Sequence, residues 1–97
     1  MTEIIWSPQS LSDLESIRTY IARDSVRYAD LVVGRIVAAV ERLRIFPESG
    51  RIVPERDAPD VREIIVRPYR VLYRVGADAI EIVTVFRASR LFPEHLG

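Results

Sequence analysis

The chain has 97 residues, of which 48% are hydrophobic, so it can form one small core but not two. Fourteen arginines balance fourteen acidic residues, and this zero net charge disfavours general binding to nucleic acid. Because the chain has no lysine, Schiff-base chemistry and a lysine general base are excluded. Without cysteine and with one histidine, a disulfide or a cysteine or histidine metal cluster cannot form, and we expect no cofactor.

The first half of the chain predicts a short strand followed by two helices. Residues 3–6 are mainly apolar, and Ser7-Pro8 is typical of a helix start. Helical spacing then predicts one buried face formed by Leu11, Leu14, Ile17 and Ile21. A second helix is expected from Val26 to Phe46, ending at Pro47, with Gly34 allowing close packing against the first. No signal peptide or membrane-length apolar run is present, so we expect a cytoplasmic protein.

The second half predicts an irregular connection over 48–60 and then three strands. The strands are expected at 61–67, 69–75 and 80–87, because these segments are rich in Val, Ile and Tyr. Their connections are short, so neighbouring strands must run antiparallel. The predicted fold is α+β, a single domain over 1–97 with the order β-α-α-β-β-β. A helix hairpin is expected to pack on one face of a mainly antiparallel sheet.

Side-chain alternation along the last two strands predicts which residues lie on each face. The face toward the helices is expected to carry Tyr69, Val71, Tyr73, Val75, Ile80, Ile82, Thr84 and Phe86. The other face is expected to remain open. It would carry Arg70, Arg74 and Arg87 around an apolar floor of Leu72, Val83 and Val85. An apolar face with an arginine rim is typical of a partner-binding surface.

Several segments, in their order and spacing, resemble the RelE/ParE superfamily of bacterial toxins. These segments are Trp6-Ser7-Pro8, Pro47-Glu48-Ser49-Gly50-Arg51, Val61–Val75 and Val83–Arg90. The resemblance runs from Ile4 to Pro93, nearly the whole chain. It implies a toxin of a type II toxin-antitoxin system, neutralised by a ParD-like or RelB-like antitoxin encoded beside it.

The superfamily has two main activities, and the resemblance favours one of them. RelE cleaves messenger RNA on the ribosome, but Glu63 and Ile65 occupy the positions of its two strand lysines. Glu94 aligns near its catalytic tyrosine and Ala88 near the preceding arginine. The ParE branch poisons DNA gyrase without chemistry of its own, which suits this sequence better. The alternatives are a metal-independent, ribosome-dependent endoribonuclease and an inactive member that only binds its antitoxin.

The candidate residues for target or antitoxin contact are Arg70, Arg74, Arg87, Arg90 and Trp6. Each also has a structural interpretation. Arg70 could instead form an ion pair with Glu63 or Glu81, and Trp6 could be buried between sheet and helix. The other arginines could be ordinary solvated charges. The tyrosines at 69 and 73 are expected in the core, with their hydroxyls at its rim.

A nuclease would need further groups. In that case, the resemblance implies that Arg70, Arg87 or Arg90 would stabilise the transition state. His95, Glu63 or Glu48 would act as the general acid or base. His95 is two residues from the end, where a frayed tail is the simpler interpretation. The antitoxin is expected to lay a helix on the helix pair or to add a strand to the sheet. We expect no membrane partner and no recognition of DNA sequence by this chain alone.

Overall fold

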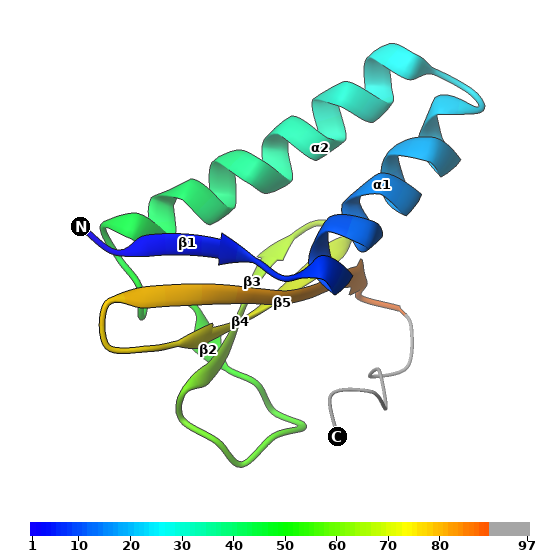
Figure 1. Ribbon diagram of the computed structural model, residues 1–97. Helices are drawn as coiled ribbons and strands as arrows, with labels where there is room; N and C mark the ends of the chain where they lie inside the picture. The colour runs from blue at the N-terminus through cyan, green and yellow to red at the C-terminus, as the bar shows by residue number, and fades with distance from the viewer. Residues whose placement is uncertain (90–97) are drawn as a thin grey trace.

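Two helices cover one face of a five-stranded sheet in the computed structural model, which describes residues 1–89 (Figure 1). The elements, in chain order, are β1 (Glu3–Trp6), α1 (Pro8–Ala22), α2 (Val26–Glu41), the 3₁₀ turn η1 (Arg42–Arg44), β2 (Arg51–Ile52), β3 (Val61–Val66), β4 (Tyr69–Val75) and β5 (Ala79–Arg87). The sheet order is β1-β5-β4-β3-β2, with β1 parallel to β5 and every other pair antiparallel. The predicted α+β architecture is confirmed.

Both helices begin at serine caps. The Ser7 hydroxyl accepts a hydrogen bond from the Ser10 N–H at 3.0 Å, and Ser25 accepts from the Tyr28 N–H at 3.1 Å. These bonds satisfy N–H groups that have no partner within the first helical turn. Two boundaries differ from the sequence prediction. The second helix ends at Glu41 and tightens into η1, and the segment expected to be irregular contains the two-residue strand β2.

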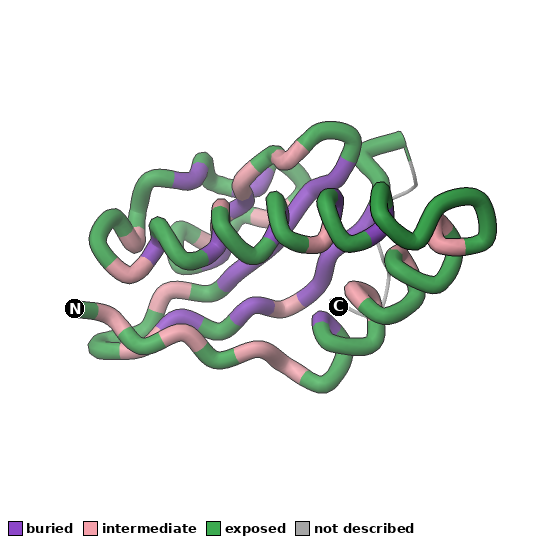
Figure 2. Tube along the Cα trace, turned by 90° about the horizontal axis from the view of Figure 1, so that it is seen from above, coloured by how far each residue is buried: buried purple, intermediate pink, exposed green. Residues whose placement is uncertain are grey.

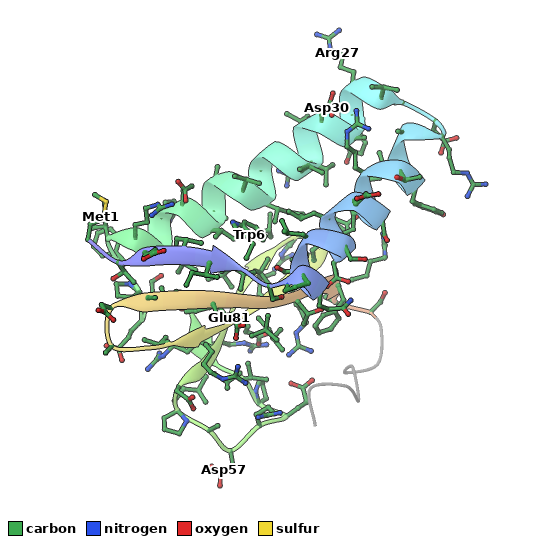
Figure 3. All side chains as sticks on the ribbon, in the orientation of Figure 1. Met1, Trp6, Arg27, Asp30, Asp57 and Glu81 are labelled. Atoms are coloured by element: carbon green, nitrogen blue, oxygen red, sulfur yellow. The ribbon has the colours of Figure 1, made fainter. Side chains whose placement is uncertain are left out.

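The main core lies between the helices and the sheet. Its buried residues are Val32, Ile36, Val40, Leu43, Tyr69, Val71, Tyr73, Ile80, Ile82 and Val85. Figure 2 shows this burial in the strands beneath the helices, while the outer turns of both helices are exposed. Trp6 is partly buried and packs on this core, as predicted (Figure 3). No helix within residues 1–89 is long and apolar enough to cross a membrane.

Two predictions about the helix pair are wrong. Gly34 is exposed and has no atom within 4 Å of the position that a Cβ would occupy, so it does not allow close helix packing. Leu11 was expected in the buried face of α1, but it is 53% exposed. Ser10 is the buried residue of the first turn, so the buried stripe of α1 follows Ser10, Leu14, Ile17 and Ile21, and Leu11 lies beside it.

A β-bulge changes the side-chain alternation of β5. Leu72 pairs with Thr84, but Tyr73 pairs with Ile82, so Val83 is an extra residue between two pairs. After the bulge, Val85 joins the helix-side core, while Phe86 packs on the opposite face. The predicted placement of Phe86 on the helix side is therefore wrong, whereas the Thr84 hydroxyl does reach Asp13 of α1. A bulge shifts the alternation by one residue, which reverses the face of every later side chain.

The opposite face of the sheet was predicted to be open, but a segment of the chain covers it. Residues 53–60, which we call the strap, follow β2 and cross this face, with Asp57 near their tip (Figure 3). Val53 and Ala58 of the strap pack on Leu72 and Phe86. Leu72 is consequently fully buried. Of the expected apolar floor, only Leu72 lies in this second small core, to which the irregular segment contributes Val53 and Ala58, while Val85 lies in the helix-side core.

Candidate functional site

Arg70 lies at the centre of a buried ion network beneath the strap. Its Nε donates to Glu63 Oε1 at 2.6 Å, and its two terminal nitrogens donate to the two carboxylate oxygens of Glu55, each at 2.9 Å. The guanidinium also lies 5.2 Å from the centre of the Phe86 ring. Only 8% of Arg70 is exposed. The structural interpretation with Glu63 is thus confirmed, whereas Glu81 pairs with Arg74 instead.

The electrostatics of this network favour the charged forms of Arg70 and Glu55. The hydrogen bonds that Arg70 donates to Glu55 and then to Glu63 raise its already high pKa, against the opposing effect of burial. The Arg70 guanidinium in turn lowers the pKa of the Glu55 carboxyl below its ordinary value. A bidentate guanidinium–carboxylate pair is among the stronger hydrogen-bonded arrangements in proteins. Glu55 therefore fastens the strap to the sheet.

Glu63 is the second anchor of the network. Its carboxylate is fully buried and also accepts from Arg51 Nε at 2.5 Å, so both of its oxygens are bonded to guanidinium groups. A general base must reach the substrate proton, but Glu63 is fully buried and each of its oxygens is bonded to a guanidinium group. Glu48, the other carboxylate considered for this role, is exposed and lies 3.7 Å from the nearest nitrogen of Arg62.

The glycine-containing segment at 47–51 is held against the sheet. The Gly50 N–H donates to the Tyr73 hydroxyl at 2.9 Å, and Arg62 donates to the Gly50 carbonyl at 2.9 Å. Tyr73 is fully buried, and this burial raises the pKa of its hydroxyl. The prediction that tyrosines 69 and 73 are core residues is confirmed. The expectation that the Tyr73 hydroxyl lies at the rim is wrong, because Gly50 covers it.

The structure does not bring the predicted contact arginines together. Arg74 is exposed on the strap side and lies 3.2 Å from Glu81 and 3.8 Å from Asp60. Arg87 follows the bulge and lies on the helix side, 6.0 Å from the centre of the Tyr69 ring. The predicted rim of Arg70, Arg74 and Arg87 around one floor is therefore wrong. Arg90 and His95 lie outside the described residues.

Arg87 borders a hollow of about 310 Å³ between α1 and the end of β5. Its wall is formed by Asp13, Ser16, Ile17, Tyr20, Tyr69, Val85, Phe86 and Arg87. Asp13 has a structural role that the sequence did not indicate. It accepts from the Thr84 hydroxyl at 2.6 Å and from the Val85 N–H at 2.9 Å, next to the bulge. Ser7, the N-cap of α1, also donates its hydroxyl to the Val83 carbonyl at 2.9 Å, so the cap and Asp13 of α1 both bond backbone groups of β5 beside the bulge.

The outer surface of the helix pair carries large apolar side chains. The residues that are at least half exposed are Leu11, Tyr20, Val26, Tyr28 and Leu31. A shallow hollow of about 650 Å³ runs along α1 from Pro8 to Arg23 and includes Leu11 and Tyr20. Within residues 1–89, no three acidic or histidine side chains are grouped to hold a metal ion. The accessible features are thus suited to contact with another macromolecule.

Comparison with known proteins decides the family. Residues 4–92 match the model of the ParE toxin of type II toxin-antitoxin system, parDE. The chain belongs to this family. It is therefore a type II toxin of the RelE/ParE superfamily, as the sequence segments predicted.

The similarity to other toxins covers nearly the whole chain. It is 33% identical to "Toxin RelE2" of Caulobacter vibrioides over 94% of this chain and all of that protein. It is 38% identical to "Putative toxin Y4kP" of Sinorhizobium fredii, over 96% and 95% of the two chains. A solved structure titled "Chromosomal ParDE TA system from P. aeruginosa" matches with a TM-score of 0.74 and 26% identity, covering 90% of this chain and 96% of that one. The dimer of YoeB from Staphylococcus aureus shares the fold, with a TM-score of 0.59 and 17% identity over 86% and 92% of the chains.

Proposed function

We propose that this ParE-family toxin acts in the cytoplasm by binding DNA gyrase and trapping its complex with cleaved DNA, and that a cognate antitoxin neutralises it by direct contact. One observation carries the choice of target. Arg70, the arginine that a RelE-like nuclease would present to RNA, is buried against Glu55 and Glu63. A guanidinium in this position cannot reach a phosphate unless the strap is displaced.

The surrounding residues support a binding mechanism over catalysis. Metal-free cleavage of RNA needs a base near the 2′-hydroxyl and cations around the developing phosphorane charge. The buried carboxylate of Glu63 is already paired with two guanidinium groups, and the chain has no lysine to replace either cation. The neutral net charge also fits a protein target better than ribosomal RNA.

The surface of the helix pair supports antitoxin binding. Exposed Leu11 and Tyr20 line the hollow along α1, and exposed Tyr28 and Leu31 lie one helical turn apart on α2, so both helices offer apolar contacts. An amphipathic helix that is disordered alone can order on such a surface. Arg87, beside Tyr20 in the hollow at the end of β5, is the exposed arginine best placed to join this contact. Arg74 is exposed on the other side of the sheet and would need a different contact.

The deciding experiment is a supercoiling and DNA-cleavage assay with gyrase and antitoxin-free, folded toxin. We expect loss of supercoiling and accumulation of cleaved DNA. Arg87→Ala should weaken the inhibition if this arginine contacts the target. Arg18→Ala is a matched control, because Arg18 is also exposed but, among residues 1–89, pairs only with Asp30 on the neighbouring helix. Full gyrase activity at saturating toxin would overturn the proposal.

A translating lysate tests the other activities in parallel. Transcript cleavage that depends on the toxin would identify a ribosome-dependent endoribonuclease instead. Harmless overexpression in a susceptible bacterium, with antitoxin binding retained, would identify an inactive member that only sequesters its antitoxin. The antitoxin itself is expected from a short reading frame that overlaps or adjoins this one.

A further inference from the structure

On its outer side, the end of β5 is bonded to α1 and its cap rather than to a strand. Strand β1 pairs with β5 only as far as Ile82, whose carbonyl accepts from the Ser7 N–H at 3.0 Å. Beyond Ile82, no strand within residues 1–89 lies on this side of β5. Ser7 donates to the Val83 carbonyl there, and Asp13 accepts from the Val85 N–H. Asp13 therefore takes the place of a strand neighbour.

The direction of the Val85 N–H depends on the bulge. Backbone groups alternate sides along a regular strand, so those of Ile82 and Val85 would point to opposite sides of an unbroken β5. In the bulged strand, the Ile82 carbonyl and the Val85 N–H point to the same side, toward the cap and first half of α1. The hydrogen bond between Val85 and Asp13 consequently forms only when Val83 is the extra residue.

The Asp13 carboxylate is fully engaged in this arrangement. Its Oδ2 accepts from the Thr84 hydroxyl at 2.6 Å and from the Val85 N–H at 2.9 Å, and its Oδ1 accepts from the Gln9 amide at 2.8 Å. Thr84 is only 2% exposed, so little water competes for its hydroxyl. Hydrogen bonds to a carboxylate are stronger than those between neutral groups. Asp13 thus favours the bulged register over the unbroken one.

The bulge also decides the face of the sheet on which Arg87 lies. In an unbroken β5, Leu72 would pair with Val83, and Arg87 would point to the strap face. In the structure, Arg87 lies on the helix side, 6.0 Å from the centre of the Tyr69 ring, and it forms no ion pair within residues 1–89. Its guanidinium borders the hollow at the end of β5 together with Tyr20.

We propose that Asp13 selects the bulged register of β5 and is thereby the positioning residue for Arg87 at the hollow. The proposal rests on the function proposed above in one respect, which is the contact of Arg87 with the target. Asp13 acts through the strand, because donors of the chain itself already occupy both of its oxygens. A residue of the first helix therefore determines which face of the last strand presents its arginine.

The register is tested by NMR on the full-length toxin alone. The α-protons of Val71 and Val85 form a closely spaced cross-strand pair in the bulged register, whereas Val71 would face Thr84 in the unbroken one. Asp13→Ala should weaken the Val71–Val85 NOE, produce a Val71–Thr84 NOE, and speed hydrogen exchange at Val85 at least about tenfold. If Asp13→Ala keeps the NOE pattern and the exchange rate of the wild type, Asp13 does not select the register.

Two further variants and a control sharpen this measurement. Asp13→Asn retains an acceptor oxygen and should keep the wild-type NOEs. Thr84→Val removes one bond to Asp13 with little change of shape, so it should shift the register in the same direction as Asp13→Ala even if that variant does not fold. Glu15→Ala removes an exposed carboxylate from the same helix and should change neither NOE. A register shift of equal size in Glu15→Ala would mean that loss of charge on α1, rather than the bond to β5, is responsible.

The link to Arg87 is tested by a double-mutant cycle in the gyrase assay, at equal concentrations of folded toxin. Arg87→Ala and Asp13→Ala should each raise the concentration for half-inhibition about three- to fivefold, as for one exposed charged contact. Because both act through one contact, the double variant should be no weaker than Arg87→Ala alone. Asp13→Asn should inhibit like the wild type. Additive losses would contradict a positioning role.

The two proposals can fail separately. If the wild-type toxin leaves gyrase unaffected, the proposed function is wrong, and the NMR experiment still decides whether Asp13 selects the register. If the toxin inhibits gyrase but Asp13→Ala keeps the wild-type NOEs, only the role of Asp13 is wrong.

Discussion

The two faces of the sheet are stabilised in different ways. Beneath the helices, ten buried residues form a core that is almost entirely aliphatic and aromatic. Beneath the strap, a core of four buried residues adjoins the Arg70 network. Burial of apolar area depends little on pH or salt, whereas a buried ion pair depends on every partner being present. Arg70, which the sequence suggested as a functional residue, is therefore the central structural residue of the face with the smaller core.

The largest effect should come from removing Arg70. Arg70→Ala leaves the buried Glu63 with one partner fewer and releases Glu55, which should lower the free energy of unfolding by about 3–5 kcal/mol. The exposed Arg74 is the control, and Arg74→Ala should cost less than about 1 kcal/mol. Urea unfolding measures both changes. Equal losses for the two variants would show that the network contributes no special stability.

Gly50 should be the next most sensitive position. A Cβ there would collide with the Glu63 carbonyl oxygen and lie 2.6 Å from the Tyr73 hydroxyl oxygen, where the backbone cannot easily move. We expect Gly50→Ala to cost about 1–3 kcal/mol, as other overpacking substitutions do. Thermal unfolding gives the comparison with wild type. Unchanged stability would mean that the 47–51 segment can shift without disturbing the sheet.

Gly34 should respond in the opposite direction. It is exposed in the middle of α2, and nothing lies within 4 Å of an added Cβ. Because alanine loses less backbone entropy in a helix, Gly34→Ala should raise the free energy of unfolding by about 0.5–1 kcal/mol. The same thermal experiment tests it. A loss of stability would indicate that α2 needs the glycine for its shape.

The smallest effect should be a pH dependence confined to the strap side. Arg70 holds the pKa of folded Glu55 below the ordinary 4.5. The pair therefore stabilises the fold fully above that value, and its contribution is lost as the pH falls through the lower folded pKa. Glu55 is 39% exposed, so solvent screening keeps the effect modest. Unfolding at pH 7 and pH 3 should show a smaller difference for Glu55→Gln than for wild type, and equal differences would contradict this assignment.

The sequence by itself determined the main elements and their order, although not the short strand β2. Ser7-Pro8 marked the start of α1, the sequence placed the start of α2 at Val26, and short turns required antiparallel neighbours for β3, β4 and β5. These features are local, because they depend on residues within a few positions of each other. The family segments likewise identified the toxin superfamily before any coordinates were considered.

Only the tertiary structure decided what surrounds Arg70. The bulge at Val83 moved Arg87 to the helix side, and the strap brought Glu55 onto a guanidinium 15 residues away. Neither event has a local sequence pattern. The Val83 carbonyl and the Val85 N–H at the bulge are hydrogen-bonded to Ser7 and Asp13, which lie more than 70 positions away in the sequence. Side-chain alternation predicts faces only while the register is unbroken, and an irregular segment has no period from which its path can be predicted.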